Sequence, residues 1–344
     1  MAILASVLFG ASTPFSKLLL GQIEPLLLAG LLYLGSGTGL ALWLGMRRLV
    51  IKPEHREAGL KLHDVPWLAA AILAGGIVAP IFLMLGLAVT PASSASLLLN
   101  LEGVLTALLA WFVFKENFDK RVLLGMAAIL AGGLLLSWQS GPALGVPWGA
   151  LAIAGACLGW GIDNNLTRKV SAADPAQIAA IKGLVAGSVN VSLAIIAGTR
   201  IPAVPHIALA GLLGFLSYGV SLSCFVLALR HIGTARTGAY FSTAPFIGAA
   251  LSLVVLHEHG SALFWIAGGL MVIGIWLHLT EKHTHQHRHE PTSHEHLHWH
   301  DEHHQHEHSP LDPPGEPHSH VHHHEELVHS HRHYPDLHHR HGHG

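Results

Sequence analysis

LLLNLEGVLTALLAWFVFKE, residues 97–116, and AYFSTAPFIGAALSLVVLHE, residues 239–258, align with each other without a gap and end in Glu116 and Glu258. A glycine-rich apolar stretch follows each of them, LLGMAAILAGGLLL in the first case and WIAGGLMVIGIWL in the second. Apolar stretches of about 20 residues are long enough to cross a bilayer as helices. The pattern therefore indicates two related halves, each built from membrane-spanning helices.

The composition separates a membrane-embedded part from a polar tail. Hydrophobic residues make up 51% of the 344 residues and charged residues only 12%, whereas soluble proteins carry about 25% charged residues. Residues 281–344 hold 24 of the 31 histidines. The composition argues against a water-soluble enzyme, and no basic domain indicates nucleic acid as a partner.

The first 280 residues contain ten apolar stretches that qualify as spans. Their approximate bounds are 2–20, 26–46, 66–87, 95–114, 121–138, 147–167, 176–198, 205–229, 236–256 and 261–280. Each half has five spans, an odd number, so the second half must enter the membrane upside down. We therefore expect an all-α, polytopic membrane protein with ten transmembrane helices, arranged as two inverted five-helix repeats at residues 1–140 and 141–280. Inverted repeats are frequent in secondary transporters, which bind substrate near the repeat interface.

Lysine and arginine gather on one side of the expected bundle. The connections after the even-numbered spans hold twelve of them: Arg47, Arg48, Lys52, Arg56, Lys61, Lys115, Lys120, Arg121, Arg168, Lys169, Arg230 and Arg236. The odd-numbered connections hold Lys17 and Arg200. Because cytoplasmic connections are enriched in Lys and Arg, we expect the even-numbered connections and both termini to be cytoplasmic, in a cytoplasmic (inner) membrane.

The two halves also begin alike. FGASTPFSK at residues 9–17 corresponds to WGIDNNLTR at residues 160–168, each with a glycine followed seven residues later by a basic residue. With the ten spans and the shared pattern of spans 4 and 9, the chain resembles the drug/metabolite transporter superfamily, in its EamA-like branch. Helix 4 of that family often reads Glu-Pro, where this chain has Glu102-Gly103, and helix 9 keeps the proline as Pro245. The resemblance implies a ten-helix transporter with a central cavity, for cargoes that range over amino acids, metabolites and drugs.

Several polar side chains interrupt the apolar spans. A charge at the bilayer centre costs about 3 kcal/mol or more on insertion scales, so such residues usually face a cavity. The residues that we expect to bind the substrate or a coupling ion are Glu102, Asn100, Asp163, Asn164 and Tyr240. The alternative for Glu102 is a structural hydrogen bond to a neighbouring helix, for Asp163 an ion pair at its helix end, and for Tyr240 apolar packing.

The tail, residues 281–344, is dominated by His-x-His repeats, whose histidines lie on one side of an extended chain. Neutral imidazole is a common ligand of Zn, Ni, Co and Cu. The candidate ligands are His283, His285, His287, His289, His294, His296, His298, His300, His303, His304, His306, His308, His318, His320 and His322. Six prolines exclude long helices and almost nothing could form a core, so we expect disorder without metal. The alternative is a solubilising low-complexity tail without a role in metal binding.

The sequence contains no P-loop, no H-E-x-x-H and no nucleophile motif. We therefore expect neither an enzyme nor an ATP-driven pump, and no required cofactor. Three functions remain open. The first is a secondary transporter of a small solute, such as a metabolite, amino acid or drug-like compound, whose cytoplasmic tail binds divalent metal. The second is a divalent metal (Ni, Co or Zn) transporter, and the third is a membrane-anchored metal buffer.

Overall fold

A computed structural model gives the fold of most of the membrane part and of four short segments in the tail. The described residues are 1–50, 59–114, 120–139, 147–170, 173–225, 227–228, 237, 240–280, 284–289, 292–298, 318–324 and 327–332. Glu116, at the end of the first quoted stretch, lies outside these ranges.

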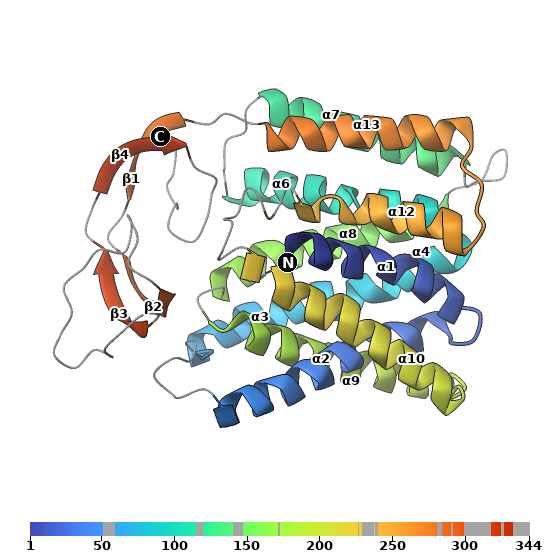
Figure 1. The fold of residues 1–344 in the computed structure, drawn as a ribbon, viewed down its shortest axis with the longest axis horizontal. Helices are drawn as coiled ribbons and strands as arrows, with labels where there is room; N and C mark the ends of the chain where they lie inside the picture. The colour runs from blue at the N-terminus through green and yellow to red at the C-terminus, as the bar shows by residue number, and fades with distance from the viewer. Residues whose placement is uncertain are drawn as a thin grey trace.

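The first half forms five helical passages, which Figure 1 shows in blue to green. Their elements are α1 (Ala2–Leu19), α2 (Pro25–Val50), the succession η2 (Leu62–Asp64), α3 (Val65–Ala71), η3 (Ile72–Val78) and α4 (Ala79–Val89), then α5 (Ala92–Leu98) with α6 (Leu101–Phe114), and α7 (Lys120–Gln139).

The second half repeats this order. Its elements are α8 (Trp148–Thr167) with η4 (Arg168–Val170), α9 (Pro175–Ile196), α10 (Val204–Gly214) with η5 (Phe215–Val220), α12 (Ala244–Val255) and α13 (Ala262–Leu279). Among the described residues, seven stretches are long and apolar enough to cross a membrane, and the apolar helices in α12 and α13 are shorter. With α8 they account for the ten expected spans, so the all-α, polytopic fold is confirmed.

The tail contains four short strands. β1 (Thr284–His289) pairs antiparallel with β4 (Leu327–Arg332), and β2 (Thr292–His298) pairs antiparallel with β3 (His318–His324). The expected disorder of the tail without metal stays a prediction. The His-x-His alternation has the two-residue period of a strand, which explains why pairing is available to it. A two-stranded ladder by itself is marginally stable at best in water.

Four passages depart from a regular α-helix at matching places in the two halves. The third passage has π-helical turns at Ile72–Val78, and the eighth has them at Phe215–Val220. The fourth passage breaks at residues 99–100, and the ninth breaks at residues 242–243. In the gapless alignment of these two passages the breaks coincide to within one residue. At membrane depth, the free N–H and C=O groups of irregular backbone need hydrogen-bond partners from protein or water. We therefore expect these breaks to face the interior of the bundle.

The helices pack with the twofold pattern that an inverted repeat requires. α1 packs on α12, and its counterpart α8 packs on α6. A Cβ added to Gly10 would lie 3.1 Å from the Gly248 nitrogen, and one added to Gly161 would lie 3.2 Å from the Thr106 nitrogen. The internal alignment matches Gly10 with Gly161 and Thr106 with Gly248, so the same helix crossing occurs twice. Lipid provides no hydrophobic force between helices, so small residues allow the close packing that holds them together.

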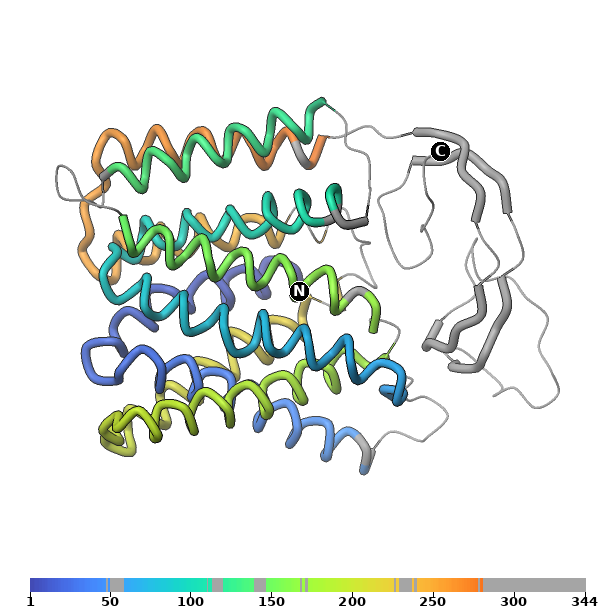
Figure 2. Tube along the Cα trace, turned by 180° about the vertical axis from the view of Figure 1, so that it is seen from behind, coloured from blue at the N-terminus to red at the C-terminus, as the bar shows by residue number. Residues whose placement is uncertain are grey.

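The fifth and tenth passages, α7 and α13, pack on each other with the same symmetry. A Cβ added to Gly132 would lie 2.9 Å from the Ala267 carbonyl oxygen, and one added to Gly274 would lie 2.7 Å from the Gly125 carbonyl oxygen. In the gapless internal alignment Gly132 corresponds to Gly274 and Gly125 corresponds to Ala267, so each contact is the repeat counterpart of the other. α7 and α13 lie along one edge of the bundle, and α2 and α9 lie along the opposite edge (Figures 1 and 2).

Two contacts join elements beside the even-numbered connections in the described part of the chain. Arg47 Nη1 lies 3.3 Å from Asp174 Oδ2, which joins the connections after spans 2 and 6. Arg121 Nη1 donates to the Thr280 carbonyl at 3.3 Å, which joins the connection after span 4 to the end of α13. Of the twelve basic residues, the structure describes the side chains of Arg47, Lys61, Lys120, Arg121 and Lys169. We call the end of the bundle where α2 ends and α7 begins the basic face (Figure 1), and its assignment to the cytoplasm stays a prediction.

We expect a reporter fused after Gly344 to behave as cytoplasmic, because the basic face carries the end of α13. The matched control is a fusion after Gly198, in the connection after span 7, which should report the opposite side. Alkaline phosphatase and fluorescent-protein fusions measure both. Alkaline phosphatase activity of the fusion at Gly344 would contradict the topology.

Candidate transport site

Glu102 stands in the first turn of α6, directly after the break in the fourth passage. The chain leaves α5 at Leu98, turns at residues 99–100, and starts α6 with the Glu102 amide donating to the Leu99 carbonyl at 3.0 Å. The turn places the Glu102 carboxylate beside α8, because α6 packs along α8. The break therefore positions the only carboxylate of this passage among the described residues.

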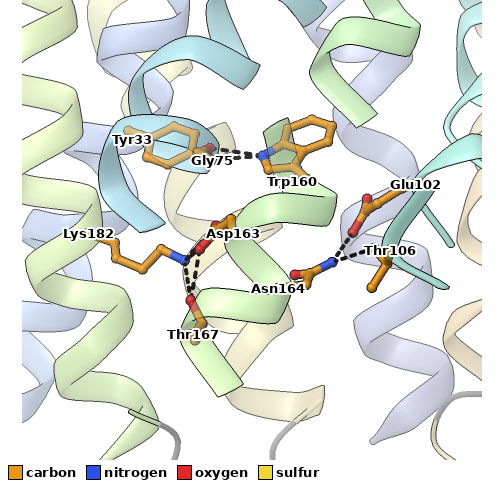
Figure 3. Close-up of polar contacts among 9 residues, drawn as sticks. All are labelled: Tyr33, Gly75, Glu102, Thr106, Trp160, Asp163, Asn164, Thr167 and Lys182. Atoms are coloured by element: carbon orange, nitrogen blue, oxygen red, sulfur yellow. Dashed lines mark hydrogen bonds and ion pairs between the residues drawn. The ribbon is translucent and has the colours of Figure 1, made fainter. Parts of the chain in front are cut away.

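Asn164 of α8 reaches Glu102 across this helix crossing. Its Nδ2 donates to Glu102 Oε1 at 2.9 Å and to Thr106 Oγ1 at 3.4 Å (Figure 3). The neighbouring Asn165 donates to the Thr106 carbonyl at 3.2 Å. Asn164 is exposed and Glu102 is partly buried, so this group of polar atoms remains accessible although it lies within spanning helices.

Asp163 points to the other side of α8 and pairs with Lys182 of α9 (Figure 3). Lys182 Nζ lies 2.5 and 2.6 Å from the two carboxylate oxygens, and Thr167 Oγ1 donates to Asp163 Oδ1 at 2.8 Å. Both charged side chains are largely buried, with exposed fractions of 9% for Asp163 and 17% for Lys182. The pair thus cancels two charges inside the bundle and links α8 to α9.

The π-helical turns of the third passage pack against this ion pair. A Cβ on Gly75 would collide with the Asp163 carboxylate, so only glycine fits there. The Gly75 carbonyl accepts hydrogen bonds from the Tyr33 hydroxyl at 2.9 Å and from Trp160 Nε1 at 3.0 Å (Figure 3). Asn190 donates to the neighbouring Gly76 carbonyl at 3.2 Å. Side chains therefore satisfy carbonyls that the π-helical turns leave free.

The structure brings together some of the expected site residues and separates others. Glu102 and Asn164 are in contact, and Asp163 is on the same helix but engaged with Lys182. Asn100 is buried in the break, where its Nδ2 donates to the Leu97 carbonyl at 2.9 Å and contacts the Met271 sulfur at 3.6 Å. No hydrogen bond among the described residues joins the Tyr240 phenol to Glu102. The roles of all five residues in transport stay predictions.

Sequence reasoning did not single out Thr106, Tyr33 and Trp160. The signal was available for two of them, because Thr106 follows Glu102 by four residues and Trp160 precedes Asn164 by four, the spacing that puts residues on one helix face. Tyr33 gave no such signal, since its role comes from a backbone carbonyl on another helix.

The repeat does not duplicate the chemistry of this site. At the matching crossing of α1 and α12, Thr13 corresponds to Asn164 and Ala244 corresponds to Glu102. Both of these side chains are buried. The twofold pattern thus provides the architecture, and the carboxylate occurs at one of its two crossings.

The predicted metal ligands fall in two groups. Six of them, His283, His300, His303, His304, His306 and His308, lie outside the described residues. The other nine lie in strands β1, β2 and β3. Elsewhere in the described chain, no group of three or more His, Cys, Asp or Glu side chains could hold a metal ion.

Comparison with known proteins identifies the family. The EamA-like transporter family matches residues 1–138 and 147–280. The chain belongs to the EamA-like transporter family. It is therefore a multi-pass membrane protein and a transporter.

Three relatives of this transporter are themselves named as transporters. An uncharacterized transporter of Methanothermobacter thermautotrophicus is 27% identical over 80% of this chain and 84% of its own. The uncharacterized inner membrane transporter YedA of Escherichia coli K12 is 25% identical over 75% of this chain and 83% of its own. The uncharacterized transporter YyaM of Bacillus subtilis is 22% identical over 78% of this chain and 88% of its own. A crystal structure with 18% identity matches with a TM-score of 0.58, over 80% of this chain and 94% of that one, and shows a shared fold.

Asp163→Asn should destabilise the transporter by about 3–5 kcal/mol, because it leaves the buried Lys182 without its counter-charge. The double variant Asp163→Asn with Lys182→Met is the matched control and should recover much of the loss. Thermal unfolding of the purified protein in detergent measures both. A single variant as stable as the parent would show that the pair does not hold α8 and α9 together.

Proposed function

We propose that this transporter is a secondary transporter of a small solute, and that Glu102 is the principal carboxylate of its translocation path. The observation that supports this most directly is the contact of Glu102 with Asn164 at the break of the fourth passage. Within the described residues, Glu102 has no ion-pair partner, whereas Asp163 is neutralised by Lys182. Glu102 is thus available to bind a cationic group or to carry a coupling proton.

The exposure of the site supports an aqueous cavity beside α6 and α8. A charged or amide side chain that faced hydrocarbon would be costly, so accessible polar groups inside spanning helices usually line water. Glu102, Thr106 and Asn164 form such a group, with Asn164 exposed. A broken helix next to the polar group is also the usual construction of substrate sites in transporters with inverted repeats.

The source of energy follows from the same reasoning. The sequence has no ATP-binding motif, so an ion or solute gradient would drive transport. A carboxylate that exchanges a proton for a cationic group couples the two movements directly, because one site holds either but not both. The cytoplasmic membrane, with both termini in the cytoplasm, is the location that the basic face supports.

Glu102→Gln keeps the shape and hydrogen bonding of the side chain but cannot ionise. We expect it to insert normally and to lose gradient-driven accumulation of the cargo, while solute exchange is retained. Uptake into proteoliposomes with and without an imposed gradient measures this. Glu24→Gln, a carboxylate in the connection after α1, is the matched control and should transport normally.

If Glu102 only ties two helices together, the result is the reverse. Glu102→Gln would then accumulate cargo normally, and Glu102→Ala would lower the melting temperature. Normal accumulation by Glu102→Gln rules out the carrier role. The cargo for this assay comes from growth of a deletion strain across Ni, Co, Zn and Cu and across a panel of amino acids and drugs. A phenotype confined to the metals would favour a divalent metal transporter instead.

For the tail we propose divalent metal binding that collects or senses metal at the cytoplasmic face. The His-x-His repeats and the interleaved carboxylates of residues 281–344 support it. A membrane-anchored metal buffer is the competing function, favoured if a transport-dead Glu102→Gln variant still protects cells from metal.

The full chain should bind several Zn²⁺ or Ni²⁺ ions at pH 7.5 that a chain ending at Glu281 does not bind. Binding should weaken toward pH 5, because metal must displace protons from imidazoles whose reference pKa is about 6.5. Isothermal titration calorimetry of the two proteins measures the difference. Equal uptake by both, or uptake indifferent to this pH change, removes the metal hypothesis.

A further inference from the structure

The connection between α4 and α5 is held by a lysine from another helix. Lys17, in the last turn of α1, donates through Nζ to the carbonyls of Leu87, Ala88 and Thr90 at 2.5, 3.1 and 2.9 Å. These carbonyls belong to the end of α4 and the residues after it, so they have no partner within their own helix. The Lys17 side chain therefore caps the C-terminal end of α4.

A carboxylate from a third helix holds the other side of the same connection. Glu258, after the end of α12, accepts hydrogen bonds from the amides of Ala92 and Ser93 at 2.7 and 2.8 Å. The residue before it, His257, has φ of 52°, a left-handed conformation that a residue with a side chain rarely adopts. Strained backbone persists where the surrounding structure enforces it, often at switch regions, and here it brings Glu258 onto α5.

α5 packs on α1 and α12. A Cβ added to Gly248 of α12 would lie 2.7 Å from the Gly10 carbonyl of α1 and 3.2 Å from the Ser96 Cβ of α5. α6, by contrast, packs along α8. The break at residues 99–100 thus separates two parts of one passage that belong to different helix groups.

We call the hydrogen bonds of Lys17 and Glu258 to the connection between α4 and α5 the clamp. Three buried hydroxyls close to it have no hydrogen-bond partner in the described structure: Ser16, Thr90 and Ser96. Ser16 precedes Lys17, Thr90 lies in the clamped connection, and Ser96 faces α12. A buried hydroxyl without a partner is rare and costly. Opening this end to water would give all three hydroxyls partners, which offsets part of the cost of breaking the five hydrogen bonds of the clamp.

We propose that Lys17 and Glu258 control access to the transport site from the end of the bundle opposite the basic face. α5 and the connection before it form the moving part, and residues 99–100 are its hinge. Glu102 lies in the first turn of α6, just after that hinge, so movement of α5 uncovers the carboxylate. The proposal rests on the family's transport function and on this geometry, and it does not require that Glu102 carry a proton.

The internal repeat supports a counterpart at the other end. The alignment matches Lys17 with Arg168 and Glu258 with Glu116. In the sequence, the same two charges therefore recur after the sixth and fourth spans. Glu116 and the side chain of Arg168 lie outside the described part of the structure.

A native cysteine reports on the hinge. Cys157 of α8 is fully buried, and its sulfur lies 3.7 and 4.0 Å from the carbonyl oxygens of Leu98 and Leu99. The only other cysteine is Cys224. In a Cys224→Ser background, the rate at which a soluble maleimide modifies Cys157 in the purified, detergent-solubilised protein measures how often α5 moves away.

We expect Lys17→Met and Glu258→Ala to be modified at least about tenfold faster than the background protein, because each loses hydrogen bonds to a charged group. Lys17→Arg retains donors for the carbonyls and should stay close to the background rate. Glu24→Ala removes a carboxylate at the same end outside the clamp, so it is the matched control and should also stay slow. Size-exclusion chromatography confirms that each variant is folded, and Glu258→Ala decides the result if Lys17→Met does not fold.

Two outcomes overturn the proposal. In the first, Lys17→Met and Glu258→Ala react no faster than the background. In the second, Glu24→Ala accelerates the reaction as much as they do, which indicates general loosening. Because modification of Cys157 needs no cargo, failure here is distinct from failure of the Glu102 assay.

Discussion

The close crossing of α1 with α12, and its image between α8 and α6, is the contact on which the rest of the structure depends. In lipid the hydrophobic effect does not press helices together, so the bundle relies on backbones that approach closely through Gly10, Gly161 and Gly248. This packing brings spans 1, 4, 6 and 9 to the centre. The irregular fourth and ninth passages lie there because neighbouring helices can satisfy their free backbone groups.

Chemistry departs from the symmetry of the architecture at this centre. One crossing carries Glu102 and Asn164, and the other carries Ala244 and Thr13 in the same places. A second carboxylate opposite the first would add repulsion and desolvation cost, whereas a single one can be served by a proton or by a cationic group. The buried pair of Asp163 and Lys182 adds no net charge. The site thus keeps one carboxylate without a counter-charge among the described residues.

Support for this carboxylate and control of access to it share one structural device. The break after α5 places Glu102 in the first turn of α6 and also allows α5 to move independently of α6. Lys17 and Glu258 hold the connection before α5 through five hydrogen bonds. The state in which these bonds are made and the state in which they are broken differ mainly in the position of the short helix α5. Two alternative packed arrangements of this kind give a discrete rather than a gradual change.

The sequence alone determined the ten spans, the inverted repeat and the basic face, because apolar length, odd span number and charge bias act locally and need no tertiary contact. It also singled out Glu102 and Asn164, since polar residues are costly within a span. Only the tertiary structure decided which partner each polar residue takes. Asp163 pairs with Lys182 of α9, and Asn100 donates to the Leu97 carbonyl and contacts the Met271 sulfur. These choices depend on helix rotation and on a break in the backbone, and neither is encoded in spacing along one helix.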